Sequence, residues 1–349
     1  MVRIENFFGN LALAETLAHM AEQDRVPQTI LLGGPEGVGK ATLARRFGML
    51  LVGDAEKIER DDLSLPANVE VIETREKWPA EKRNDDPLFF STHPDFVTFA
   101  PDGPLAQITI QQMRLLRERA QLRPLRGNRR VFVIDHLERA NEQAANSLLK
   151  VLEEPPEHLI IIGTTENLYD LLPTIRSRSV VFQLGRLSED EMQAFARARN
   201  LTDSDARIVL AGGSPGVAVK LDLAQFRERR ALIVSALECG SQIEPFSTWV
   251  AQSESFLSRK SEKLETYLKL AYSVLEDVLR AHQGCPAVIS RDIQQRITAI
   301  GQKITFEWIE RAVKLVDELV EMARRNIQKG PAMDAFVIGL RNLAARELH

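Results

Sequence analysis

The sequence predicts a P-loop domain of the α/β class, built on a parallel sheet and followed by an all-helical region. Three observations support this. Short apolar runs alternate with stretches of helical periodicity in the first half of the chain. One of these runs leads directly into a glycine-rich loop that ends in lysine, and after residue 182 strand patterns give way to helical ones. Apolar runs separated by helices are typical of a parallel sheet that is covered on both faces.

The predicted strands are short and almost entirely apolar. They cover residues 29–32, 95–99, 131–134, 159–162 and 180–182. A helix is predicted over 141–154, between the third and fourth strands. Asn141 is a suitable N-cap, apolar residues then recur at helical spacing, and Pro155-Pro156 ends the helix.

The length of 349 residues suggests two or three domains. We expect a sheet domain, a short helical unit with a turn at 212–216, and a long helical region with amphipathic stretches near 262–282, 305–325 and 331–347. The corresponding boundaries are 1–184, 185–223 and 224–349. Residues 54–86 hold 11 acidic and 6 basic residues and few apolar ones, which predicts a surface excursion or a mobile loop.

Composition excludes several classes of protein. Apolar residues make up 44% and charged residues 27%, with a net charge of −4, as in soluble globular proteins. No run is long and apolar enough for a membrane span, and the polar N-terminus predicts no secretory signal. Cys239 and Cys285 are too few for a disulfide framework or a four-cysteine zinc site. The six histidines lack metal-ligand spacing, so the sequence predicts no metal site. The low cysteine count predicts a reduced, cytoplasmic protein.

The loop from Gly34 to Lys40 lies between a predicted strand and a predicted helix, which is the context a P-loop requires. Its glycines let backbone N–H groups converge on phosphate oxygens, and the lysine supplies a cation. Asp135 directly follows the third strand, as the aspartate of a Walker B motif does in P-loop proteins. The predicted nucleotide-binding residues are therefore Gly34, Gly37, Gly39, Lys40, Thr42 and Asp135.

Two parts of a hydrolytic site are replaced. Ala41 stands where a Ser or Thr hydroxyl would bind Mg²⁺, and Thr42 lies about 100° further round the helix. His136 stands where AAA+ ATPases usually carry a glutamate that orients water. The sequence therefore predicts a chain that can hold ATP or ADP but does not hydrolyse ATP by itself.

Two long strings, at 145–156 and 172–179, resemble bacterial clamp-loader subunits of DNA polymerase III, which belong to the AAA+ class. Phe8-Gly9-Asn10, His93-Pro94-Asp95 and residues 325–328 fit the same family, so the resemblance covers almost the whole chain. It implies a RecA-like AAA+ domain at 1–184, a helical lid at 185–223 and a helical collar at 224–349 that joins five subunits into a ring.

The resemblance also implies partners and a role. The partners would be the gamma/tau and delta subunits in a hetero-pentamer, the beta sliding clamp indirectly, and primer–template DNA through the assembled complex. The chain would be a component of a DNA-directed DNA polymerase, a nucleotidyltransferase, with no independent ATPase activity. Arg178 matches the arginine that such a subunit donates in trans to the neighbouring gamma/tau ATP site, because a guanidinium stabilises charge on a transferring phosphoryl group.

Three departures from the family pattern bear on this role. Ser179 replaces a cysteine beside Arg178, where only the arginine's charge is needed. Residues 50–92 contain no cysteine, so the zinc module of many relatives is not expected. Gly216 stands where active subunits carry an arginine that senses nucleotide. The residue that contacts nucleotide from the end of the fourth strand would be Thr164 or Thr165.

Residues 114–130 hold seven arginines, at 114, 117, 119, 123, 126, 129 and 130, against the single acid Glu118. This segment is either a surface for DNA phosphates or a solvated helix face. Two other functions stay open: an active gamma/tau-type ATPase, and an unrelated P-loop enzyme such as a small-molecule kinase. Ala41, His136 and Gly216 speak against the ATPase. The kinase would need a Mg²⁺-binding hydroxyl after Lys40 and would not explain the strings at 146–156 and 177–178.

Overall fold

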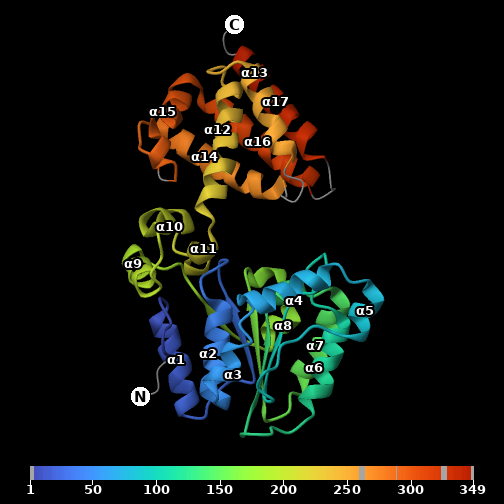
Figure 1. Cartoon of the computed structure of the whole chain (residues 1–349). Helices are drawn as coiled ribbons and strands as arrows, with labels where there is room; N and C mark the ends of the chain where they lie inside the picture. Colours follow the sequence, from blue (N-terminus) through green and yellow to red (C-terminus); the bar gives the residue numbers. More distant parts are fainter. Residues whose placement is uncertain (1–3, 259–263, 288, 324–327, 347–349) are drawn as a thin grey trace. The chain divides into compact units, whose positions relative to one another are not determined.

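The computed structural model describes residues 4–258, 264–287, 289–323 and 328–346 (Figure 1). The chain divides into two compact units, Met1–Lys220 and Leu221–His349, and each is described by itself. The first unit contains the sheet and the second is helical. The predicted α/β fold, a parallel-sheet domain with a P-loop followed by helical segments, is confirmed.

A five-stranded parallel sheet forms the centre of the first unit. Its order is β2-β3-β4-β1-β5, so the P-loop strand β1 pairs with β4 on one side and with β5 on the other. All five predicted strands are confirmed. Their bounds are β1 (Thr29–Gly33), β2 (Phe96–Phe99), β3 (Arg130–Ile134), β4 (Leu159–Thr165) and β5 (Val180–Gln183).

Helices cover both faces of this sheet (Figure 1). Side chains alternate along β1, so Ile30 packs in the core on the side of α2 while Leu31 packs in the core on the side of α7. Asn141 caps α7 as predicted, since its Oδ1 accepts a hydrogen bond from the N–H of Ala144 at 2.9 Å. The covering helices are α1 (Leu11–Glu22) and α2 (Lys40–Val52) on one face, and α6 (Ile110–Ala120) and α7 (Glu142–Glu153) on the other.

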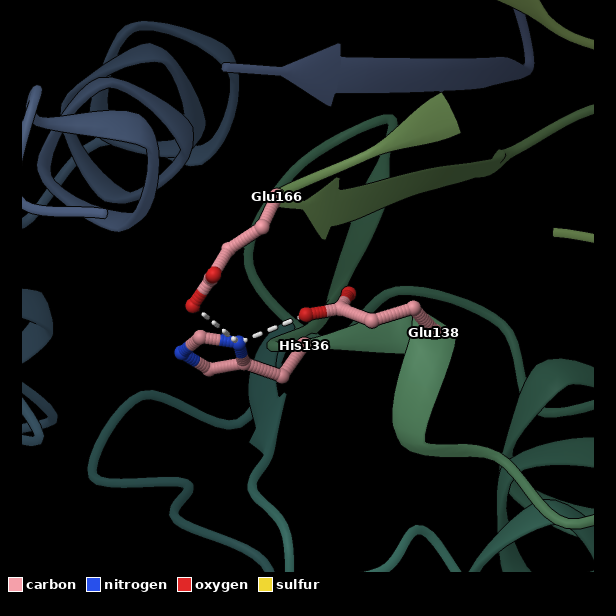
Figure 2. Close-up of side chains that lie close together, drawn as sticks. All are labelled: His136, Glu138 and Glu166. Carbon is pink, nitrogen blue, oxygen red and sulfur yellow. Dashed lines mark hydrogen bonds and ion pairs between the residues drawn. The ribbon is translucent and has the colours of Figure 1, made fainter. Parts of the chain in front are cut away.

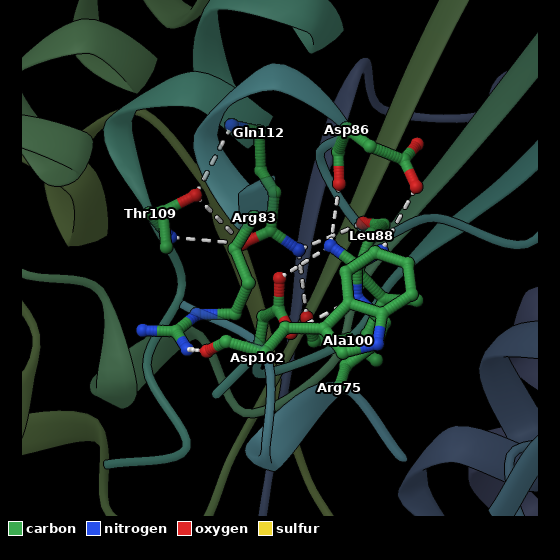
Figure 3. A network of polar contacts seen from close by, with 9 residues as sticks. Arg75, Arg83, Asp86, Leu88, Ala100, Asp102, Thr109 and Gln112 are labelled. Atoms are coloured by element: carbon green, nitrogen blue, oxygen red, sulfur yellow. Dashed lines mark hydrogen bonds and ion pairs between the residues drawn. The ribbon is translucent and has the colours of Figure 1, made fainter. Parts of the chain in front are cut away.

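Residues 54–86 form three short helices that are largely exposed, so of the two predicted alternatives the surface excursion is the one observed. The helices are α3 (Ala55–Glu59), α4 (Pro66–Glu76) and α5 (Ala80–Asp85). Apart from Ile58, which packs in an apolar core, the segment is held mainly by polar groups, which is why no periodicity marked it. Arg75 is 4% exposed, and its guanidinium donates to both carboxylate oxygens of Asp102, at 3.1 and 2.8 Å (Figure 3).

Residues after β5 form the short helices α9 (Glu189–Ala198), α10 (Ser204–Ala211) and α11 (Pro215–Lys220). They share a small apolar core that includes Leu187, Met192 and Ala218. These helices belong to the first compact unit. The division of that unit into a sheet domain and a lid at 184/185 stays a prediction.

The second unit is built from long helices around two buried tryptophans. Trp308 Nε1 donates to the carbonyl of Leu340 at 3.1 Å, and Trp249 Nε1 donates to Asp334 at 2.7 Å. Of the segment 325–328, which fits the clamp-loader family in sequence, Arg325 to Ile327 lie outside the residues that the structure describes. Nowhere in the described ranges does a helix combine the length and apolar character that crossing a membrane requires. The helices are α12 (Leu223–Gly240), α13 (Phe246–Ser258), α14 (Leu264–His282), α15 (Gln294–Lys303), α16 (Phe306–Ala323) and α17 (Lys329–Arg346).

Candidate functional site

The loop from Gly34 to Gly39 joins β1 to α2 at the carboxyl edge of the sheet. Gly34, Gly37 and Gly39 have φ angles of 148°, 75° and 102°, which L side chains rarely adopt. A Cβ on Gly34 would also come within 2.5 Å of the Leu184 carbonyl oxygen. Glycine is therefore required for this turn, and the loop presents its backbone at the start of α2 as a phosphate site would.

Lys40 is bonded to its own loop. Its Nζ donates to the carbonyl of Gly34 at 2.6 Å and to that of Pro35 at 2.8 Å. Burial lowers the pKa of Lys40, and the carboxylates of Glu166 and Asp135 oppose that shift. Thr42 is half-buried in the first turn of α2. The ammonium that would bind phosphate therefore already donates two hydrogen bonds to carbonyl oxygens of its own loop.

The helix α11 lies against the same loop. The N–H of Gly216 donates to the carbonyl of Gly37 at 2.8 Å. A Cβ on Gly37 would come within 2.9 Å of the Val217 nitrogen, so the two backbones are in close contact. Gly216, the position expected to carry a nucleotide-sensing arginine in active subunits, therefore contacts the loop through its backbone.

Asp135 follows β3, and Thr164 lies near the end of the neighbouring strand β4. Thr164 Oγ1 donates to Asp135 Oδ1 at 2.6 Å and accepts from the N–H of His136 at 3.0 Å. Thr165 Oγ1 instead donates to the carbonyl of Asn167. Of the two threonines that the sequence left open, Thr164 is the one that contacts the acidic residue.

His136 faces two carboxylates (Figure 2). Its Nδ1 is hydrogen-bonded to Glu138 Oε1 at 2.9 Å and lies 3.8 Å from Glu166 Oε1. The hydrogen bond to Glu138 raises the pKa of His136. The sequence interpretation missed Glu138 and Glu166. The available signal was position, since both follow the carboxyl ends of adjacent parallel strands, where polar side chains converge.

Arg178 lies between α8 (Pro173–Ser177) and β5, and its side chain is 38% exposed. One guanidinium nitrogen donates to the Thr174 carbonyl at 3.2 Å, and another is 3.4 Å from Glu153 Oε1. The residue borders a cavity of about 440 Å³ that is also lined by Pro27, Gln28, Leu152 and Pro155. Within the first unit, the structure does not bring Arg178 together with Lys40 or Asp135 in any hydrogen bond or ion pair among the described residues.

The arginines of 114–130 fall into two groups. Four are engaged: Arg119 lies over the Phe89 ring, Arg126 and Arg129 pair with Asp54 and Asp24, and Arg130 is buried beside Asp95. The other three are exposed and have no carboxylate partner in the part of the chain that the structure describes. These three are Arg114, Arg117 and Arg123.

Comparison with known proteins agrees with the sequence motifs. Residues 86–188 match the family model described as DNA polymerase III, delta subunit. The chain is 25% identical to DNA polymerase III subunit delta' of Bacillus subtilis over 333 residues, which cover 93% of this chain and 94% of that protein. It is 31% identical to subunit delta' of Pseudomonas aeruginosa over 217 residues, 60% of each chain.

A shorter match links the chain to a second kind of subunit. Over 85 residues, 24% of this chain and 15% of the relative, it is 40% identical to DNA polymerase III subunit gamma/tau of Mycobacterium tuberculosis. The resemblance to clamp-loader subunits is confirmed, and the relatives matched over 333 and 217 residues carry the name delta-prime.

Proposed function

We propose that this chain is the delta-prime subunit of a DNA polymerase III clamp loader, and that it does not hydrolyse ATP. It donates Arg178 to the ATP site of a neighbouring gamma/tau subunit while the sliding clamp is loaded onto primed DNA. One observation carries the mechanism: Arg178 is exposed at the surface while the chain's own P-loop lysine is bonded to its own loop. The similarity to delta-prime subunits supports the clamp-loader role.

The state of the chain's own site supports the absence of hydrolysis. A Mg²⁺-binding hydroxyl is missing at Ala41, and His136 replaces the residue that would orient water. Lys40 already directs two of its three N–H donors, at 2.6 and 2.8 Å, to carbonyl oxygens of its own loop rather than to a phosphate. The helix α11 also bonds to the loop through Gly216. ATP or ADP that binds here would be held without being cleaved.

Arg178 is held weakly enough to be released. Its contact with Glu153 is at 3.4 Å and both side chains are exposed, so the ion pair stabilises the protein by about 1 kcal/mol at most. A guanidinium that meets a transferring phosphoryl group in trans contributes ~10³–10⁵ in rate. The second interaction is much stronger, so Glu153 orients the arginine in the free subunit without retaining it.

Assembly and ATP hydrolysis test the proposed function together. Mixed with delta and gamma/tau subunits, the full chain should enter a hetero-pentamer, seen as one species by native mass spectrometry. Alone, it should hydrolyse no ATP above the background of a Lys40→Ala variant. Robust hydrolysis by the chain alone would instead favour an active gamma/tau-type ATPase, and failure to assemble would exclude the clamp-loader role.

The three arginines without a carboxylate partner are the proposed contacts to DNA phosphates. Arg119 is unsuitable for a test because its guanidinium lies over the Phe89 ring, so its replacement would also disturb packing. Charge reversal at Arg117 and Arg123 together should weaken binding of the assembled loader to primed DNA by roughly tenfold or more at low salt, and reduce the salt slope by about two. Arg197→Glu, at an exposed position on α9, serves as the control. Fluorescence anisotropy measures both effects, and unchanged binding would refute the contact.

A further inference from the structure

An imidazole and two carboxylates meet at the carboxyl ends of β3 and β4 (Figure 2). The candidate ligand atoms of His136, Glu138 and Glu166 all lie within 4.8 Å of one another. We propose that these three side chains bind one transition-metal dication of the zinc class. This role goes beyond the proposed function and does not depend on it, because it requires neither another subunit nor nucleotide.

Two of the three separations between ligand atoms are close to those around a tetrahedral ion. Bonds of 2.0–2.2 Å from zinc to nitrogen and oxygen place neighbouring ligand atoms roughly 3.3–3.6 Å apart. The observed separations from His136 Nδ1, 2.9 Å to Glu138 and 3.8 Å to Glu166, lie on either side of that range. Nδ1 would give its shared proton to solvent and bind the metal instead. Three protein ligands leave the fourth position to water.

The surrounding structure fixes two of the three ligands. His136 adopts φ 52°, and its N–H is bonded to Thr164, which is itself bonded to Asp135. The Glu138 side chain is 12% exposed, and its Oε2 is buried with no hydrogen-bond partner in the described parts of the chain. A buried carboxylate oxygen without a partner is unfavourable, and a bound cation would compensate it. Glu166 is more exposed and can adjust.

Charge at this place favours a cation over a phosphate. Asp135, Glu138 and Glu166 all interact electrostatically with Lys40, whose ammonium is turned toward the carbonyls of Gly34 and Pro35. Imidazole combined with carboxylate is a donor set that suits zinc and similar ions, whereas Mg²⁺ prefers six oxygens in octahedral geometry. The electrostatics and the donor set therefore both favour a transition metal.

The test is a titration of the full chain, freed of metal by chelation, with Co²⁺ followed by Zn²⁺. The expected result is one equivalent of Co²⁺ with the visible absorption of a tetrahedral site, displaced by one equivalent of Zn²⁺. His136→Ala and Glu166→Gln should each weaken binding by at least about 100-fold. His19→Ala is the matched control, because His19 Nδ1 lies 3.6 Å from one carboxylate, that of Glu22, and should leave binding unchanged. Circular dichroism checks that each variant is folded, and Glu166 is exposed enough for Gln to be tolerated.

Removing the charge of Lys40 distinguishes the metal site from a nucleotide site. Lys40→Met should raise the affinity for Zn²⁺ by roughly tenfold or more, since it removes a nearby positive charge. The same change would weaken binding of a nucleotide. The proposal is overturned if the wild-type chain takes up no stoichiometric Co²⁺, if His136→Ala binds as well as wild type, or if Mg²⁺ competes on equal terms. None of these outcomes depends on whether the chain assembles into a clamp loader.

Discussion

Replacing Arg178 with alanine should reduce ATP hydrolysis at the neighbouring site of the assembled clamp loader by ~10³–10⁵. At about 1.36 kcal/mol per tenfold change, this is roughly 4–7 kcal/mol of barrier. The reason is that a guanidinium is planar, permanently charged and able to contact two phosphoryl oxygens at once. The measurement is ATP hydrolysis by the reconstituted loader with sliding clamp and primed DNA, in the steady state and in a single turnover.

Two further variants separate the charge of Arg178 from its shape. Arg178→Lys keeps a positive charge but loses the planar fork, so its loader should be slower than wild type and faster than the alanine variant. Arg197→Ala, at an exposed position on α9, should leave the rate unchanged. A loader that contains Arg178→Ala, assembles normally and hydrolyses ATP at the wild-type rate would refute the arginine finger.

The sheet and the P-loop could be predicted because their signals are local. A strand such as 159–162 is a continuous apolar run, and a turn between Gly34 and Lys40 needs glycine at fixed positions whatever surrounds it. The same is true of α7, where Asn141 and Pro155 mark the two ends within one short segment. Each of these features depends on a few adjacent residues, so the sequence alone is sufficient to place it.

The state of the candidate site could not be predicted in the same way, because it depends on contacts between distant segments. Gly216 lies 179 positions after Gly37 in the chain. The resemblance assigns both positions to the nucleotide site, but neither segment indicates that their backbones are hydrogen-bonded to each other. Lys40 has the right position for phosphate binding, and only the structure shows that its ammonium is bonded to its own loop. Glu166 likewise joins His136 only through the pairing of β3 with β4.

The helices of 54–86 escaped prediction for a different physical reason. An amphipathic pattern marks a helix that buries an apolar face, but α4 buries an arginine. Arg75 and its main partner Asp102 are 27 positions apart, and each looks like an ordinary surface charge in the sequence. Polar anchoring of this kind leaves no periodic signal.

Replacing Arg75 with alanine should lower the local stability of 54–86 by about 3–5 kcal/mol, because it leaves the buried carboxylate of Asp102 without its partner. Burial by itself would lower the pKa of Arg75, but the hydrogen bonds and charge of Asp102 raise it above the ordinary value. The guanidinium also bonds to Asp86 and lies over the Trp78 ring, with 4.7 Å between the guanidinium carbon and the ring centroid. Hydrogen exchange of α4 amides measures the change, and at about 1.4 kcal/mol per tenfold their protection should fall by roughly 100- to 4,000-fold.

Two further variants serve as controls for the Arg75→Ala experiment. Arg60→Ala is the matched control, since Arg60 pairs with Glu56 at 2.6 Å on an exposed helix surface and should cost about 0.5 kcal/mol or less. The double change Arg75→Met with Asp102→Leu should restore much of the protection, because a buried ion pair replaced by apolar groups of similar volume is often neutral. Equal effects of Arg75→Ala and Arg60→Ala would show that the pair does not anchor the segment.

The position of Arg75 explains how this segment can fold without cysteines. The zinc module expected of many clamp-loader subunits between the P-loop and His93 is not expected here, because residues 50–92 contain no cysteine. A structural zinc would fix such a segment by joining four side chains. Here one guanidinium joins α4 to Asp86 beyond α5 and to Asp102 beyond β2, so it links three stretches of chain at a single buried point. An ion pair needs no metal supply and resists chelators. A single substitution is enough to break the ion pair. If the pair anchors this segment, the double variant should restore the protection of α4 amides from exchange, and a chelator should not change that protection.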